Sequence, residues 1–264
     1  MGKFKGGPRG FQLVRNKGKG KEEEVEEDVE SEEVSMGGPT TEFFGSETGI
    51  ILLNEAITHE SAANIVDQFY ACYAKAPAEP ITIYINSPGG DVYSSLMIVD
   101  VIRTSPVPVI GVVSGMAGSG ALLLLEACHH RLIMPNSLLF WHHVVMSHLL
   151  LTVDTPESAS KQLNEYNFIN KHVQDFFFNR VSLSEENRKK YFDNKNDVTF
   201  NAVTSKRIGL VDKIVSDINE IADLQEKLSL SIKKDLLNKL KEKDKKPLKP
   251  AKPKAKVVAA ASLP

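Results

Sequence analysis

The chain has 264 residues, of which 42% are hydrophobic and 25% charged, and its formal net charge is −2. This length allows one or two domains, and the near-neutral charge argues against a protein that binds nucleic acid over its whole surface. The two cysteines, Cys72 and Cys128, lack metal-ligand spacing and favour a reducing compartment. No apolar run reaches the roughly 20 residues that a membrane span needs, and none precedes the first charged residues. We therefore expect a soluble, cytoplasmic protein.

Three composition regimes divide the chain. Residues 1–48 are basic and then acidic, with few large apolar side chains, so we expect a disordered charged arm. Residues 49–216 contain nearly all the apolar periodicity and are the expected globular domain. Residues 217–264 are expected to be a tail that is helical over 217–243, where leucine and isoleucine recur at helical spacing, and then rich in Lys, Pro and Ala.

Strand and helix patterns alternate within residues 49–216. Short apolar or β-branched runs predict strands at 49–53, 81–85, 107–113, 131–134, 137–141, 198–200 and 210–215. Helical spacing predicts helices at 61–74, 92–104, 121–127, 156–180, 184–192 and 202–207. Such alternation predicts an α/β fold with a largely parallel sheet and right-handed crossovers.

Two glycine-rich turns follow neighbouring expected strands. The first is Asn86-Ser-Pro-Gly-Gly90, and the second lies in the run 114–121, where Ser119 has a glycine on either side. Both turns should lie at the carboxyl edge of the sheet, where α/β active sites gather. A serine at a strand-to-helix turn gains exposure and helix N-terminal N–H groups. Backbone N–H groups of Gly90 and Gly120 could together hold the oxyanion of a tetrahedral intermediate.

A histidine pair offers a base for this serine. His142 and His143 follow an expected strand and should point to opposite faces, so at most one can serve Ser119. A carboxylate is needed on the other imidazole nitrogen, but the pattern alone does not select one of the 34 acidic residues. The rival interpretation is a metal site made of His142, His143 and His148, for which the sequence offers no further ligand at suitable spacing.

In order along the chain, these motifs resemble those of the proteolytic subunit of the Clp protease, the ClpP family. The matching segments are Tyr84-Ile-Asn-Ser-Pro-Gly-Gly90, Gly115-Met-Ala-Gly-Ser119, Pro135-Asn-Ser137 and Gly209-Leu-Val-Asp212. The resemblance covers residues 49–216. It places the nucleophile on Ser119, the base on His142 rather than His143, and the aspartate on Asp197.

The resemblance implies a crotonase-like α/β fold with a long handle helix at 156–180. It also implies a cofactor-free serine endopeptidase whose subunits form heptameric, stacked rings, to which an AAA+ unfoldase delivers protein substrates. No metal, membrane or nucleic acid is expected.

Two departures from the family leave other functions open. Gly120 stands where methionine is usual, which should keep the backbone donor but loosen the pocket wall, and Val144 replaces a proline. The alternatives are a catalytically inactive subunit of a mixed ring, a capsid-maturation protease of the same fold, and a crotonase-fold enzyme that acts on an acyl thioester.

Overall fold

A computed structural model describes residues 49–145, 155–192 and 197–245, all of which lie in the compact unit Thr40–Pro264. The charged arm expected at 1–48 and the tail at 246–264 lie outside the described residues, as does His148. Of the described helices, none combines the length and apolarity needed to cross a membrane.

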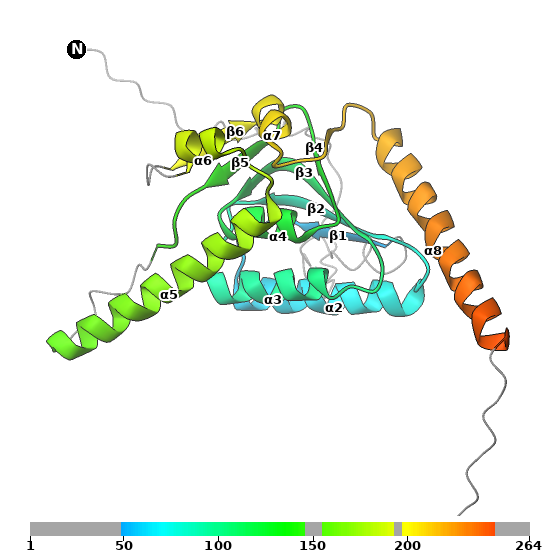
Figure 1. Ribbon diagram of the computed structural model, residues 1–264, viewed down its shortest axis with the longest axis horizontal. Coiled ribbons are helices and arrows are strands. Elements are labelled where there is room, and N and C mark those ends of the chain that lie inside the picture. The colour runs from blue at the N-terminus through cyan, green and yellow to red at the C-terminus, as the bar shows by residue number, and fades with distance from the viewer. Residues whose placement is uncertain (1–48, 146–154, 193–196, 246–264) are drawn as a thin grey trace, which may run out of the picture. The chain divides into compact units, whose positions relative to one another are not determined.

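The described residues form seven strands and seven helices that alternate along most of the chain (Figure 1). The strands are β1 (Ile50–Leu53), β2 (Ile81–Ser87), β3 (Val109–Gly118), β4 (His130–Ile133), β5 (Leu138–Trp141), β6 (Val198–Asn201) and β7 (Lys213–Ile214). The helices are α2 (His59–Lys75), α3 (Val92–Arg103), α4 (Gly120–Ala127), α5 (Pro156–Arg180), α6 (Glu185–Tyr191), α7 (Ala202–Ile208) and α8 (Asn219–Lys245).

The strands make one sheet of order β1-β2-β3-β4-β7, and all neighbours on this path are parallel. On the side away from β2, strand β3 has two partners, because residues 110–113 pair with β4 and residues 116–118 pair with β5. Strand β5 in turn pairs antiparallel with β6. The predicted α/β class with a largely parallel sheet is confirmed and is consistent with a crotonase-like fold.

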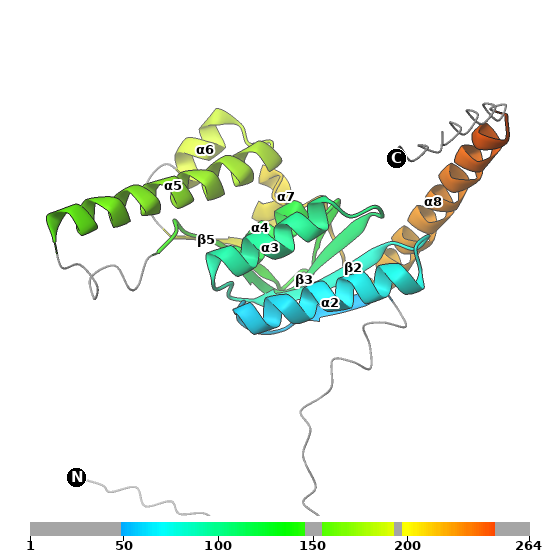
Figure 2. The same ribbon diagram turned by 90° about the horizontal axis from the view of Figure 1, so that it is seen from below.

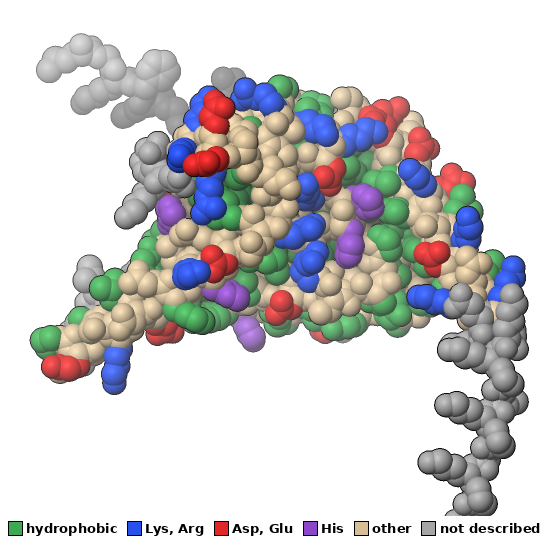
Figure 3. Space-filling model, in the orientation of Figure 1, with side chains coloured by type: hydrophobic (Ala, Val, Ile, Leu, Met, Phe, Trp, Pro, Cys, Tyr) green, Lys and Arg blue, Asp and Glu red, His purple; other side chains and the backbone are tan. Residues whose placement is uncertain are grey.

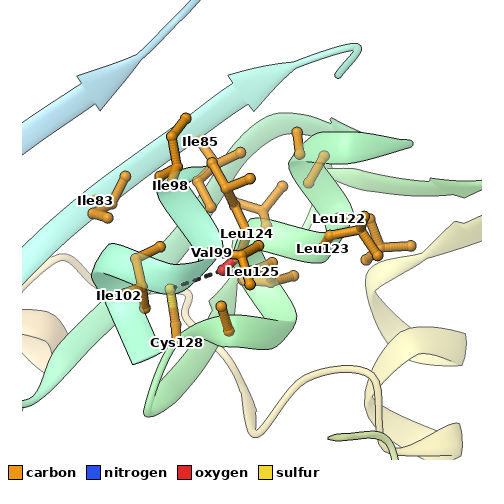
Figure 4. Packing of buried hydrophobic residues seen from close by; sticks show 14 of the residues in the cluster. Ile83, Ile85, Ile98, Val99, Ile102, Leu122, Leu123, Leu124, Leu125 and Cys128 are labelled. Carbon is orange, nitrogen blue, oxygen red and sulfur yellow. Dashed lines mark hydrogen bonds between the residues drawn. The ribbon is translucent and has the colours of Figure 1, made fainter. Parts of the chain in front are cut away.

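One face of the sheet packs against α2, α3 and α4 and forms the main core (Figures 2 and 4). Helix α4 is buried along its whole length because it lies between the sheet, α3 and α5. Alternate residues of β3 point to opposite faces, so Val109 and Val113 belong to this core while Ile110 and Val112 belong to a second, smaller one. Helix α8 supplies Ile221 to the second core.

Helix α5 begins where the sequence predicted, at Pro156. The Thr155 side chain accepts a hydrogen bond from Ser158 N, and the Ser158 hydroxyl accepts one from Thr155 N, which is a capping box. The buried residues of α5 all lie in its C-terminal half, from Ile169 onward, and its N-terminal half extends away from the sheet (Figures 1 and 2). Acidic and basic side chains are interspersed along the face of α5 seen in Figure 3.

Two sequence-based boundaries were wrong. Strand β3 continues to Gly118, through a stretch that we expected to belong to the turn, because Ser87 pairs with Ala117 and β5 pairs with residues 116–118. Strand β7 contains only Lys213 and Ile214 of the six residues expected at 210–215. Leu210 and Val211 bury their side chains in the core without pairing with β4.

Candidate active site

Ser119 occupies the turn between β3 and α4 in a strained backbone conformation. Its φ of 50° and ψ of −120° resemble the first central residue of a type II′ turn, which normally requires glycine. Among the described residues it is the one non-glycine residue with positive φ, and such strain, of order 1–3 kcal/mol, concentrates at functional sites. Ser119 N donates to Phe140 O at 2.9 Å, and the Ser119 carbonyl accepts from Leu122 N and Leu123 N. These bonds hold the conformation.

The Ser119 hydroxyl is not used to cap its helix. A serine at the N-cap ordinarily accepts a hydrogen bond from the second or third N–H of the helix. Ser119 makes no such bond, whereas Asp91, the N-cap of α3, accepts from Ser94 N at 2.8 Å. The hydroxyl is therefore available to groups in front of the turn.

The two glycine-rich turns are in direct contact. Gly89 has φ +88°, and a Cβ atom there would clash with Gly118 O and lie 2.7 Å from Gly120 N and 2.9 Å from Ser119 Cβ. A Cβ atom at Gly118 would lie 2.9 Å from Pro88 O. Because β2 and β3 are adjacent and parallel, the expected meeting of these turns at one edge of the sheet occurs.

Among the described residues, no backbone oxygen accepts a hydrogen bond from the N–H group of Gly90 or of Gly120. Ile57 N donates to Gly89 O and Asp91 N donates to Ile57 O, both at 2.9 Å, in a parallel bridge. In this pattern the bonded atoms belong to the residues on either side of Gly90, so its own N–H points away from Ile57. Gly120 is the first residue of α4, and the first N–H of a helix has no partner within the helix.

The structure separates the two histidines as expected. His142 lines a cavity of about 880 Å³ together with Ser119, Gly90 and Gly120. His143 does not line it; its Nδ1 hydrogen-bonds to Gln174 Nε2 of α5 at 3.0 Å, and its ring contacts Trp141. His142 is therefore the histidine on the same side as Ser119.

Asp197 and His142 lie side by side at the end of the β5–β6 pairing, but no hydrogen bond joins their side chains. The last pair of the β5–β6 register is Trp141 with Val198, so His142 and Asp197 are the next residues along each strand. Among the described residues no hydrogen bond or ion pair joins Ser119, His142 and Asp197, and Asp197 is exposed. Backbone proximity is thus present without the contacts of a formed triad.

Among the described residues, no group of three or more His, Cys, Asp or Glu side chains could hold a metal ion. His148, the third histidine of the rival metal site, lies outside those residues.

A buried ionic cluster behind the nucleophile turn escaped the sequence analysis. Glu126 of α4 is completely buried, and its Oε2 accepts from Arg131 Nη1 at 2.6 Å. Arg131 also binds Asp212, through Nη2 at 2.7 Å, and Arg180 Nε donates to the Glu126 carbonyl at 2.6 Å. The cluster therefore ties the C-terminal end of α4 to β4, to α5 and to the residue before β7. A glutamate in an otherwise apolar eight-residue helix was the signal that could have indicated a buried partner.

Burial raises the pKa of Glu126 to about 7, against the attraction of Arg131. Burial alone would lower the pKa of Arg131, but its bonds to Asp212 and Glu126 raise it, so this guanidinium stays charged. Burial also raises the pKa of Cys128 to about 12. The Cys128 Sγ contacts the Leu124 carbonyl at 3.3 Å within the core (Figure 4), so this thiol is neutral and enclosed.

Comparison with known proteins finds one family over this part of the chain. The family model described as Clp protease matches residues 44–217. ATP-dependent Clp protease proteolytic subunit 1 of Streptomyces avermitilis is 28% identical over 174 residues, which are 65% of this chain and 77% of that protein. The corresponding subunit of Deinococcus radiodurans is 28% identical over 65% of this chain and 82% of its own length. Subunit 2 of Treponema denticola is 30% identical over 66% and 84%.

Proposed function

Because the chain belongs to the Clp protease family, we propose that it is a serine endopeptidase subunit in which Ser119 is the nucleophile. His142 acts first as general base and then as general acid, and Asp197 orients its imidazole. The N–H groups of Gly90 and Gly120 stabilise the oxyanion.

The proposed reaction follows from these positions. Ser119 Oγ attacks the carbonyl carbon of the substrate while its proton passes to His142, and the carbonyl oxygen becomes an oxyanion facing the Gly90 and Gly120 N–H groups. His142 then gives the proton to the departing amine and the C–N bond breaks. Water, deprotonated by His142, releases the acyl group and restores Ser119.

The strained Ser119 backbone, with its hydroxyl left uncapped at the cavity, is the observation that supports this proposal most strongly. A purely structural serine N-cap would satisfy a helix N–H, and a purely structural turn would place glycine at φ 50°. The strain is consistent with a position selected for chemistry rather than for stability.

We also propose the quaternary organisation that is known for the family: rings of subunits, heptameric and stacked, that receive unfolded protein from an AAA+ ATPase. The names of the relatives describe proteolytic subunits of an ATP-dependent protease. Sedimentation velocity of the full chain tests the ring directly, since a heptamer of 29.1 kDa subunits separates clearly from a monomer.

The decisive experiment is reaction with a fluorophosphonate probe, followed by mass spectrometry. We expect one adduct, on Ser119, in the wild type and in Ser114→Ala, which alters a serine of the preceding strand. The Ser119→Ala variant should give no adduct and should lose peptide hydrolysis by several orders of magnitude. Undiminished hydrolysis by Ser119→Ala would exclude the proposal.

The two histidines provide a matched pair for the base. His142→Ala should abolish both labelling and hydrolysis, because Ser119 would lose its proton acceptor. His143→Ala should retain labelling, since His143 binds Gln174 and does not line the cavity. The opposite result would assign the base to His143.

An inactive structural subunit is the second candidate function. It is favoured by the absence, among the described residues, of hydrogen bonds that join Ser119, His142 and Asp197. A sample shown to be assembled that neither reacts with the probe nor cleaves peptides would favour this candidate.

A further inference from the structure

The cavity in front of Ser119 changes in polarity from its inner wall to its rim. Next to the serine the wall is apolar, with Leu123 of α4 and Trp141 of β5. Further out, the residues of α5 that line the cavity change from apolar, at Val173 and Ile169, to acidic, at Glu165. Glu165 precedes Ile169 by one helical turn, which is about 6 Å along the axis. An extended lysine or arginine side chain can bridge such a step.

The charge at this rim is negative. Glu165 and Asp91 are the carboxylates among the lining residues, and the described lining contains no lysine or arginine. Hydrogen bonds from Ser94 lower the pKa of Asp91, so Asp91 is ionised at neutral pH. No ion pair of Glu165 occurs among the described residues, so no cation in the described part of the chain neutralises its charge.

Tyr93 fixes the position of the rim carboxylate. Its hydroxyl donates to Glu165 Oε1 at 3.3 Å, which connects the first turn of α3 to α5 across the cavity. The second carboxylate oxygen accepts no hydrogen bond from the described residues and can take a donor from a bound molecule. The rim therefore holds an oriented acceptor as well as a charge.

From this arrangement we infer that Glu165 is a specificity-determining residue and that the cavity favours substrates with a lysine or arginine side chain at the cleavage site. The aliphatic part of that side chain would lie against Leu123 and Ile169, and its cation would reach Glu165 and Asp91. Lysine and arginine place their stems on apolar surface and their charges near solvent in the same way elsewhere. The inference rests on the proposed peptidase function of the same cavity.

The test compares two N-acetylated fluorogenic peptides that differ only in lysine or norleucine at the residue before the scissile bond. Norleucine keeps the aliphatic stem and removes the charge. For two exposed carboxylates we expect kcat/KM to favour lysine about fivefold at low salt and less at high salt. Glu165→Gln should reduce this ratio about threefold, whereas Glu157→Gln, at the exposed start of α5 and outside the cavity lining, should not change it.

A second arm makes the inference independent of turnover. Fluorescence anisotropy measures the binding of the same two peptides, without their scissile fluorophore and with an end label, to the full-length Ser119→Ala variant. Tighter binding of the lysine peptide, reduced by adding Glu165→Gln, supports the inference even if hydrolysis is too slow to measure. Equal or tighter binding of the norleucine peptide overturns it, as does binding of neither peptide.

The two failures are distinguishable. Hydrolysis that survives in Ser119→Ala would exclude the proposed nucleophile, whatever the peptide. Hydrolysis that depends on Ser119 but favours norleucine over lysine would leave the peptidase proposal in place and overturn the specificity inference alone.

Discussion

Gly120 provides the sharpest test of how the nucleophile turn is packed. It is the residue after Ser119, and a Cβ atom there would clash with Ser95 Oγ and lie 3.1 Å from Ser95 Cβ. Ser95 is fully buried in α3, and its hydroxyl donates to Asp91 O at 2.7 Å. A methyl group at position 120 must therefore displace a side chain that is already held in place.

The magnitude of the Gly120→Ala effect follows from three contributions. Overpacking a filled site costs about 1–3 kcal/mol, and turning the Ser95 hydroxyl away from Asp91 O costs about 1 kcal/mol more. The higher helix propensity of alanine offsets up to about 1 kcal/mol of this loss in stability. We expect a net loss of about 2 kcal/mol in the free energy of unfolding. We also expect about a tenfold fall in kcat/KM, because the first N–H of α4 would shift.

Ser95→Ala is the matched partner, since it removes the clashing oxygen. Asp91 O still accepts from Ser95 N at 3.0 Å, so Ser95→Ala alone should cost under about 1 kcal/mol. In that background Gly120→Ala should cost about 1 kcal/mol or less, which gives a coupling energy of about 1–2 kcal/mol. Urea unfolding and peptide hydrolysis measure both effects. Additive effects of the two substitutions, or a Gly120→Ala protein as stable as the wild type, would refute this account of the turn.

Three further predictions concern the surroundings of the site. The pKa of Glu126 rises from 4.5 to about 7 on folding, so its contribution to stability is complete below about pH 4.5 and is lost as the pH rises through 7. The stability of Glu126→Gln relative to the wild type should therefore rise by about 2.5 kcal/mol between pH 5 and pH 8; a difference in unfolding free energy between the two proteins that is the same at both pH values would contradict this. Gly89→Ala should cost more than about 2 kcal/mol and suppress hydrolysis, because its Cβ would meet backbone at positive φ. Gly49→Ala, with φ +67° and, among the described residues, a contact only to Pro80 O at 3.4 Å, should cost about 1 kcal/mol without changing the reaction. Leu228→Ala in α8 should lower the free energy of unfolding by about 1–2 kcal/mol, because Leu228 packs on the second core. The control is Leu237→Ala, which should change it by under about 0.5 kcal/mol because the Leu237 side chain is 56% exposed. Equal effects would mean that α8 does not pack on the sheet.

The sequence alone was sufficient for the order of the elements and for the candidate nucleophile. Local patterns decide where a helix starts, as at Pro156, and where glycine permits a turn, as at Gly89 and Gly90. Alternating elements then restrict the topology to a parallel sheet, and this brings the ends of β2 and β3 together. Ser119 follows from these local rules, because a serine between two glycines at a strand end is a local pattern.

Only the tertiary structure decided which histidine faces Ser119. His142 and His143 are adjacent and chemically identical, and the strand places them on opposite sides; the contact with Gln174, 31 residues away, occupies His143. The resemblance to a family favoured His142 in the sequence, but the physical distinction depends on long-range packing against α5. The position of Asp197 beside His142 likewise depends on the antiparallel pairing of β5 with β6, a contact between segments more than fifty residues apart.

The charged groups around the site show the same division. A glutamate in an apolar helix indicates that Glu126 needs a buried partner. The identity of that partner, Arg131, and the further link to Asp212 depend on how β4 and the segment before β7 meet. Glu165 lies at the rim of the cavity only because α5 packs near the start of α3, where Tyr93 donates a hydrogen bond to it. Sequence periodicity determines which face of an element is apolar, whereas the neighbours of a polar side chain are set by the packing of distant elements, and the chemistry of this cavity depends on those neighbours.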